Sequence, residues 1–157
     1  MYDTHMHMIR FSFTTLTLLG LVAVGCSGSS SSPTSPSSAS GSLSLTAGQI
    51  AGRWSLTSLQ PTGQAAQARP SGATYDLTFA GGRVSTRADC NVCNAPVSMS
   101  GQMLTIGGPH LACTLAACPT MAFENTYTSI LAGDSRANVS GSMLTLSSTR
   151  GVLRFTR

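Results

Sequence analysis

The sequence predicts a mainly β fold, a small antiparallel β-barrel or strongly curved sheet that one α-helix covers at about residues 119–131. Three observations lead to this prediction. From Ile50 onward apolar and polar residues alternate in short runs, glycine-containing turns separate the runs, and one later segment has helical periodicity instead. A chain of 157 residues has room for one domain and little more.

Alternation places the strands. The first is expected at Arg53–Leu59, which directs three apolar side chains toward the core, namely Trp54, Leu56 and Leu59. The second follows at Tyr75–Phe79, and Gly81–Gly82 then forms a tight turn because glycine accepts the positive φ of two-residue hairpin loops. Later strands are expected at Arg83–Asp89, in a hairpin from Val97 to Ile106, in a second hairpin from Ala137 to Leu146, and at Gly151–Arg157.

The helix is expected between the two hairpins, from about Pro119 to Leu131. Pro119 suits the first helical position, where its missing N–H leaves no bond unmade. Gly133 can end the helix in a left-handed cap. The apolar side chains that share one face are Phe123, Tyr127 and Ile130. This face is expected to cover one side or end of the sheet.

The N-terminus has the anatomy of an export signal over residues 1–25. A polar start precedes an apolar stretch of 14 residues, Phe11–Val24, which is about 21 Å long as a helix and too short for a bilayer core. Ala23-Val24-Gly25-Cys26 resembles the bacterial lipobox, whose cysteine is diacylated and becomes the new N-terminus. We therefore expect lipidation at Cys26 and attachment to the membrane by that lipid.

Residues 26–49 are expected to be a disordered tether before a folded domain at 50–157. Ten of the sixteen residues from Ser27 to Ser42 are Ser, so the segment buries no apolar area. By resemblance to Gram-negative lipoproteins, Ser27 after the cysteine favours the periplasmic face of the outer membrane over retention in the inner one. The nine cationic residues are all Arg, and they are spread along the chain, so the sequence shows no basic patch of the kind that binds nucleic acid. We also expect the protein to be a monomer.

Four cysteines remain after Cys26, and an even number in an exported chain indicates disulfides. They are Cys90, Cys93, Cys113 and Cys118, and their spacing leaves three pairings open. A zinc site of Cys90, Cys93, His110 and Cys113 is one alternative. A redox Cys90–Cys93 motif is another, although Pro96 argues against the helix that such a motif needs.

Other candidate side chains carry little catalytic signal, so we expect no catalytic residue, no metal and no cofactor. His110 is the one His beyond the signal, and a lone His is more often structural than a base. Glu124 is interpreted first as a solvated charge on the helix, then as a buried partner of an Arg, and last as a functional acid. Trp54 is interpreted as core rather than as a ligand platform, but all three stay candidates for binding.

From about residue 50 to 157 the sequence resembles the META domain family, with its HslJ-like heat-shock lipoproteins. The marks, in chain order, are Trp54 in the first strand, Asp89-Cys90-Asn91 where the family has Gly-Cys-Asn, Leu104 and Ile106 in a hairpin, Thr114-Leu115-Ala116-Ala117-Cys118-Pro119 where the family commonly has Thr-Arg-Met-Ala-Cys-Pro, Glu124, Tyr127 and Leu131 in the helix, and Leu144, Leu146 and Phe155 in the last strands. The resemblance implies a Cys90–Cys118 bridge, with Cys93–Cys113 as an added inner one.

The resemblance also implies a small, mostly β domain, often exported and lipid-anchored and associated with stress and antibiotic tolerance, without an established reaction. We expect a non-enzymatic envelope lipoprotein that binds an envelope protein or a small ligand. The principal alternative is a periplasmic protease inhibitor, because Ala51–Leu56 also resembles the opening of small β-barrel inhibitors of secreted metalloproteases. A thiol-redox or zinc-binding protein is the third hypothesis.

Overall fold

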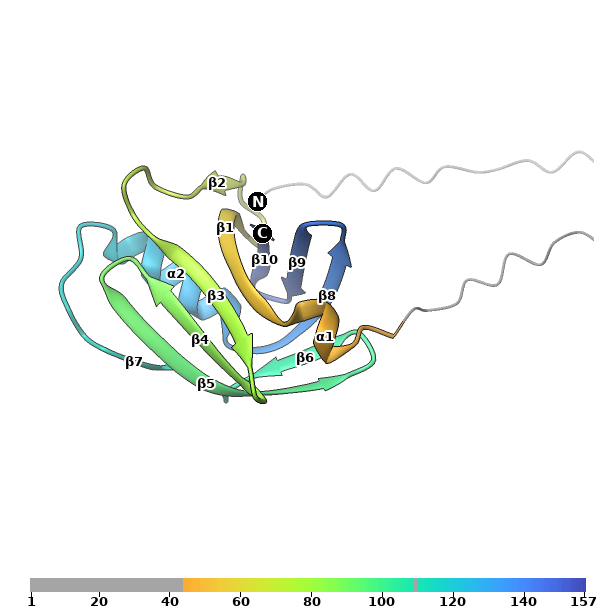
Figure 1. Ribbon diagram of the computed structural model, residues 1–157. Coiled ribbons are helices and arrows are strands. Elements are labelled where there is room, and N and C mark those ends of the chain that lie inside the picture. The colour runs from red at the N-terminus through yellow and green to blue at the C-terminus, as the bar shows by residue number, and fades with distance from the viewer. Residues whose placement is uncertain (1–43, 109) are drawn as a thin grey trace, which may run out of the picture. The chain divides into compact units, whose positions relative to one another are not determined.

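The computed structural model describes residues 44–108 and 110–157, which form ten strands and two helices (Figure 1). Neither of these helices has the length and hydrophobicity of a membrane span. In chain order the elements are α1 (Ala47–Ile50), β1 (Gly52–Pro61), β2 (Gln67–Ala68), β3 (Tyr75–Ala80), β4 (Arg83–Ala88), β5 (Asn91–Ser100), β6 (Met103–Ile106), β7 (Ala112–Cys113), α2 (Met121–Leu131), β8 (Gly133–Ser140), β9 (Met143–Ser148) and β10 (Gly151–Thr156).

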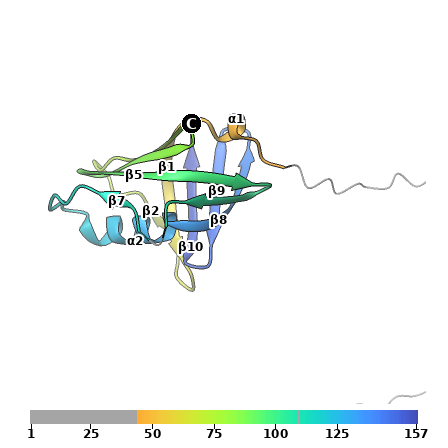
Figure 2. The same cartoon turned by 90° about the horizontal axis from the view of Figure 1, so that it is seen from below.

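Eight strands form a closed antiparallel barrel. The sheet runs in the order β1, β3, β4, β5, β6, β8, β9, β10, and β10 then pairs with β1. The closing pair extends from Ser55 opposite Thr156 to Pro61 opposite Gly151. The two short strands lie outside this circle, β2 on β1 and β7 on β5. The expected barrel is therefore confirmed, and α2 is its covering helix (Figure 2).

Side chains fill the barrel interior, as expected for eight strands. The largest fully buried side chains are Trp54, Tyr75, Tyr127, Phe155, Leu56, Leu59, Leu77, Leu104, Ile106, Leu131, Leu144 and Leu153. The first strand directs Trp54, Leu56 and Leu59 inward as expected. A shift of register between Leu56 and Ser58 keeps Leu59 on the inner face, although it stands an odd number of positions after Leu56.

The helix begins two residues later than the sequence suggests. Pro119 is outside it, in a turn closed by the bond from Met121 N to Cys118 O at 3.3 Å, and Thr120 is the N-cap. Cys118, the residue before Pro119, is bonded to Cys90. At the other end Ala132 is the cap, and Gly133, with φ of 82°, already begins β8.

The folded domain also begins earlier than expected. The sequence predicts a tether over residues 26–49, but Ala47–Ile50 form α1, and both Leu45 and Ile50 are buried. Thr46 and Gln49 cap this helix, since Gln49 Oε1 accepts a bond from Thr46 N at 2.8 Å. The signal, Cys26 and the rest of the tether lie outside the described residues.

Candidate functional site

Two disulfides hold the long loop between β6 and α2 against β5. Cys90, just before β5, is bonded to Cys118, and Cys93 within β5 is bonded to Cys113 in β7. This is the pairing that the family resemblance implies. The bridges bring together segments that are 28 and 20 residues apart in the sequence. They fix the strip 111–118 beside α2.

The same bonds bear on the zinc and redox alternatives. Cys90 and Cys93 each join a distant cysteine and not one another, so the C-x2-C motif is not a closed redox pair. With both bridges formed, none of the four sulfurs is a thiolate that could bind zinc. Among the described residues, no three His, Cys, Asp or Glu side chains come together in a metal-binding group.

Asn91, the first residue of β5, connects this strip to α2. Its Nδ2 donates to both oxygens of Glu124, at 2.9 and 3.1 Å, and to Ala116 O at 3.0 Å. Its Oδ1 accepts from Thr114 Oγ1 at 2.9 Å and from Ala116 N at 2.8 Å. One buried amide side chain therefore satisfies the backbone of the strip and the carboxylate of the helix together.

Glu124 is not the solvated helix charge that the sequence suggests, because only 6% of its surface is exposed. The second interpretation is also wrong, since the single ion pair among the described residues joins Arg53 to Asp76. Instead, the carboxylate is held by the Asn91 amide and lies in the first turn of α2, where the helix dipole favours negative charge.

A second polar chain joins the start of α2 to the barrel wall. Thr120 Oγ1 donates to Asp89 Oδ2 at 2.6 Å, and Tyr75 Oη lies 2.8 Å from the same hydroxyl. Deeper inside, Tyr127 Oη is 2.6 Å from Thr86 Oγ1. Burial raises the pKa of both tyrosines, so both stay neutral donors at physiological pH.

A surface groove follows α2 along the disulfide-held strip. Its two parts, of about 350 and 400 Å³, share Leu111, Cys113, Asn125 and Thr128. Glu124 and Asn91 lie at the base of one part, and the exposed His110 and Arg150 line the other. Leu115, which is 96% exposed, stands at the rim. The structure thus places Glu124 and His110 on one groove.

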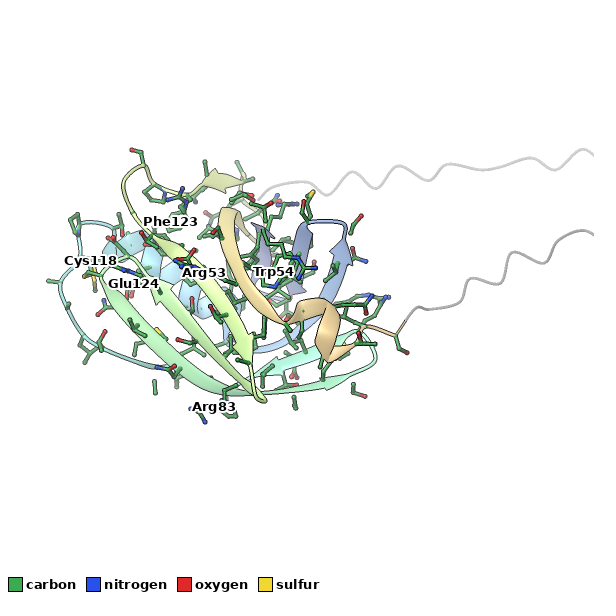
Figure 3. All side chains as sticks on the ribbon, viewed as in Figure 1. Arg53, Trp54, Arg83, Cys118, Phe123 and Glu124 are labelled. Atoms are coloured by element: carbon green, nitrogen blue, oxygen red, sulfur yellow. A yellow bond between two sulfur atoms is a disulfide. The ribbon has the colours of Figure 1, made fainter. Side chains whose placement is uncertain are left out.

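Trp54 lies elsewhere, inside the barrel, and has no exposed surface. Its Nε1 donates to Ile50 O at 2.7 Å, and the Arg157 guanidinium stacks 4.4 Å from the ring centroid. Figure 3 shows Cys118, Phe123 and Glu124 grouped around α2, away from Trp54. Trp54 is therefore a core residue and not part of the groove.

The fold and the spacing of these residues agree with one protein family, and the META domain model matches residues 44–157. The chain belongs to the META domain family. An NMR structure of a protein from Burkholderia xenovorans has 22% identity and a TM-score of 0.58, over 71% of this chain and 85% of that chain. A second NMR structure has 20% identity and a TM-score of 0.56, over 71% and 94%. No curated protein matches.

Asp89, which replaces the family's Gly, has a φ of 56°, so this position needs a left-handed backbone. Asp tolerates that conformation better than most side chains. The residue that sequence reasoning missed is Asn91. It stands in Asp89-Cys90-Asn91, where the META domain family has Gly-Cys-Asn, and its place between Cys90 and Cys93 is the signal that the sequence offers.

Proposed function

We propose that this META domain is a non-enzymatic envelope lipoprotein, exported by residues 1–25 and anchored through a diacylated Cys26. The observation that carries the proposal is the pair of disulfides, Cys90–Cys118 and Cys93–Cys113. Such bonds persist outside the cytosol and are rare within it. The lipobox resemblance supplies the anchor, and the periplasmic face of the outer membrane is the expected site in a Gram-negative host.

The barrel binds its partner on its outer surface, because large side chains fill the interior. The groove along α2 is the best-formed place for an envelope protein or a small ligand. It combines the exposed Leu115 with polar groups fixed by Asn91 and by the two bridges. A rigid strip of this kind favours binding, since little loop entropy is lost on association.

Mass spectrometry of the native protein tests the proposal. The expected product starts at Cys26, carries a diacylglycerol thioether and contains the two bridges. A Cys26→Ala variant should carry no diacylglycerol and keep its disulfides. Detection of an unacylated, fully reduced chain in the cytosol would refute the proposal.

The family association with stress and antibiotic tolerance has its own test. Loss of the protein should raise sensitivity to envelope stress, and the wild type should restore tolerance better than the Cys26→Ala variant does. Equal restoration of tolerance by the two proteins would show that the role in tolerance does not need the lipid anchor.

The fold alone does not separate the inhibitor hypothesis from this proposal, since both expect a small β-barrel. Trp54 and Leu56, the apolar residues of the segment that suggested it, are both buried in the barrel. Their pattern is therefore explained by packing.

A further inference from the structure

The end of the barrel opposite α2 combines exposed arginines with exposed apolar side chains. We define the α1 end as α1 together with the turns at 81–82, 100–102 and 140–142. Arg157 links the residue after α1 to the turn at 140–142, since its Nη1 donates to Ala51 O at 3.4 Å and its N donates to Ser142 O at 3.0 Å. Residues of α1 and Gly81–Gly82 line one cavity. Figures 1 and 2 both show α1 and the β5–β6 turn on the side away from α2.

Three exposed arginines, Arg83, Arg136 and Arg157, lie at this end without a side-chain carboxylate partner among the described residues. Arg157 already stacks on Trp54, so Arg83 and Arg136 are the two that can meet a ligand. Arg83 begins β4, and Arg136 donates through Nη2 to Gln102 Oε1 at 2.5 Å, in the β5–β6 turn. The four carboxylate side chains of the described residues lie elsewhere or are engaged: Asp76 pairs with Arg53, Asp134 accepts from Thr105, and Asp89 and Glu124 lie beside α2.

The same end exposes apolar surface. Met103 and Met143, the first residues of β6 and β9, are 47% and 52% exposed. Between α1 and the β3–β4 turn lies a cavity of about 520 Å³. Its apolar lining includes Ile50, Phe79, Val97, Met99 and Leu104, and Arg83 is the one charged side chain that lines it.

We propose that the α1 end docks onto an anionic phospholipid bilayer, with Arg83 and Arg136 meeting headgroup phosphates. Met103 and Met143 enter the interface, and the cavity beside Arg83 receives apolar lipid atoms below a phosphate. Arginine suits this role because its planar guanidinium binds phosphate oxygens in pairs. The proposal deepens the proposed function, on which it rests for the anchor.

The position of the chain's exit supports this occupant. The described residues start at Ser44, next to α1, and 17 residues separate that point from Cys26. The root-mean-square separation of the ends of a random-coil chain of 17 residues is about 20 Å. An anchor at Cys26 therefore holds the α1 end near the bilayer, and its high effective concentration makes a weak surface attraction sufficient.

The test uses the mature chain from residue 26 with Cys26→Ser, so that no acyl group contributes to binding. Cosedimentation with phosphatidylglycerol-containing vesicles is compared with that on phosphatidylcholine alone. The variant Arg83→Gln/Arg136→Gln is compared with Arg87→Gln/Arg150→Gln, which removes the same charge from positions nearer α2. If Arg83 and Arg136 bind phosphate, the partition coefficient on the anionic vesicles should fall about tenfold or more for the first double variant. It should fall about twofold or less for the second.

Binding to the anionic vesicles alone, lost with Arg83 and Arg136, would support the proposal. Lower hydrogen exchange at 81–83, 101–103 and 141–143 on vesicles would confirm the orientation. No binding, or equal loss in both arginine pairs, would overturn it. The chain in this assay is unacylated, so failure to bind vesicles would refute the docking surface and would not bear on lipidation of Cys26. An unmodified Cys26 in the native protein would instead refute the proposed function.

Discussion

The two ends of this META barrel are held together by different means. At the α2 end a long irregular loop is fixed by two disulfides, by the amide of Asn91 and by a helix. At the α1 end tight hairpin turns and a helix of four residues close the structure without any covalent link among the described residues. Closing a short turn costs little entropy, so a disulfide stabilises most where it closes a long loop.

Removal of the disulfides should give the largest effect. Cys90→Ala/Cys118→Ala opens a link across 28 residues, for which the chain-entropy relation gives a loss of about 3.5 kcal/mol in the free energy of unfolding. Denaturant unfolding under oxidising conditions measures the loss. Hydrogen exchange should rise at 110–118 and stay unchanged at the turns of the α1 end.

The inner bridge offers a comparison for that experiment. Cys93→Ala/Cys113→Ala should cost a similar amount, because its link spans 20 residues, and it should leave the Asn91 bonds in place. Equal increases in hydrogen exchange at both ends of the barrel would show that the two ends unfold as one unit and are not stabilised separately.

Loss of the Asn91 side chain should have the next largest effect. Asn91→Ala leaves the buried Glu124 carboxylate without its amide donor and frees the strip at Ala116, which should cost about 2–3 kcal/mol. Asn94→Ala is the matched control, since Asn94 is exposed on the same strand and should change stability by about 0.5 kcal/mol or less. A double variant with Glu124→Gln should recover part of the loss.

The barrel could be predicted from the sequence because its signals are local. Alternation of Tyr75, Leu77 and Phe79 and the Gly81–Gly82 turn are each set within a few residues. Helix α1 could not be found this way, since four residues are too few for periodicity and they follow a serine-rich stretch.

The candidate site was harder to predict than the fold. In the sequence Glu124 has the pattern of a solvated charge on a helix. Its burial depends on the strip 111–118, which the two disulfides hold beside α2. The role of Asn91 likewise exists only once residues more than 20 positions away are brought beside it. Long-range covalent contacts of this kind have no local pattern.

Closure of the barrel can be tested at Gly151, where β10 meets β1. A Cβ there would collide with Gln60 O and lie 2.9 Å from Ile130 Cδ1, and φ is 152°. Gly151→Ala should therefore cost about 2 kcal/mol through displaced backbone. Gly141→Ala, in a turn of the α1 end with open space around it and φ of 58°, should cost about 1 kcal/mol. A larger loss at Gly141, measured by thermal unfolding, would contradict this order.

The smallest effect is expected at Asp89, where the cost of a left-handed backbone opposes the gain from a hydrogen bond to Thr120. Asp89→Gly relieves the left-handed φ of 56° but removes the acceptor for Thr120, so stability should change by about 1 kcal/mol or less. Asp89→Ala removes the same acceptor without relieving the backbone, and it should be about 1 kcal/mol less stable than Asp89→Gly. Urea unfolding of both variants isolates the backbone contribution. Equal stability of the two would mean that the hydrogen bond to Thr120, and not the left-handed backbone, is what this position contributes to the α2 end.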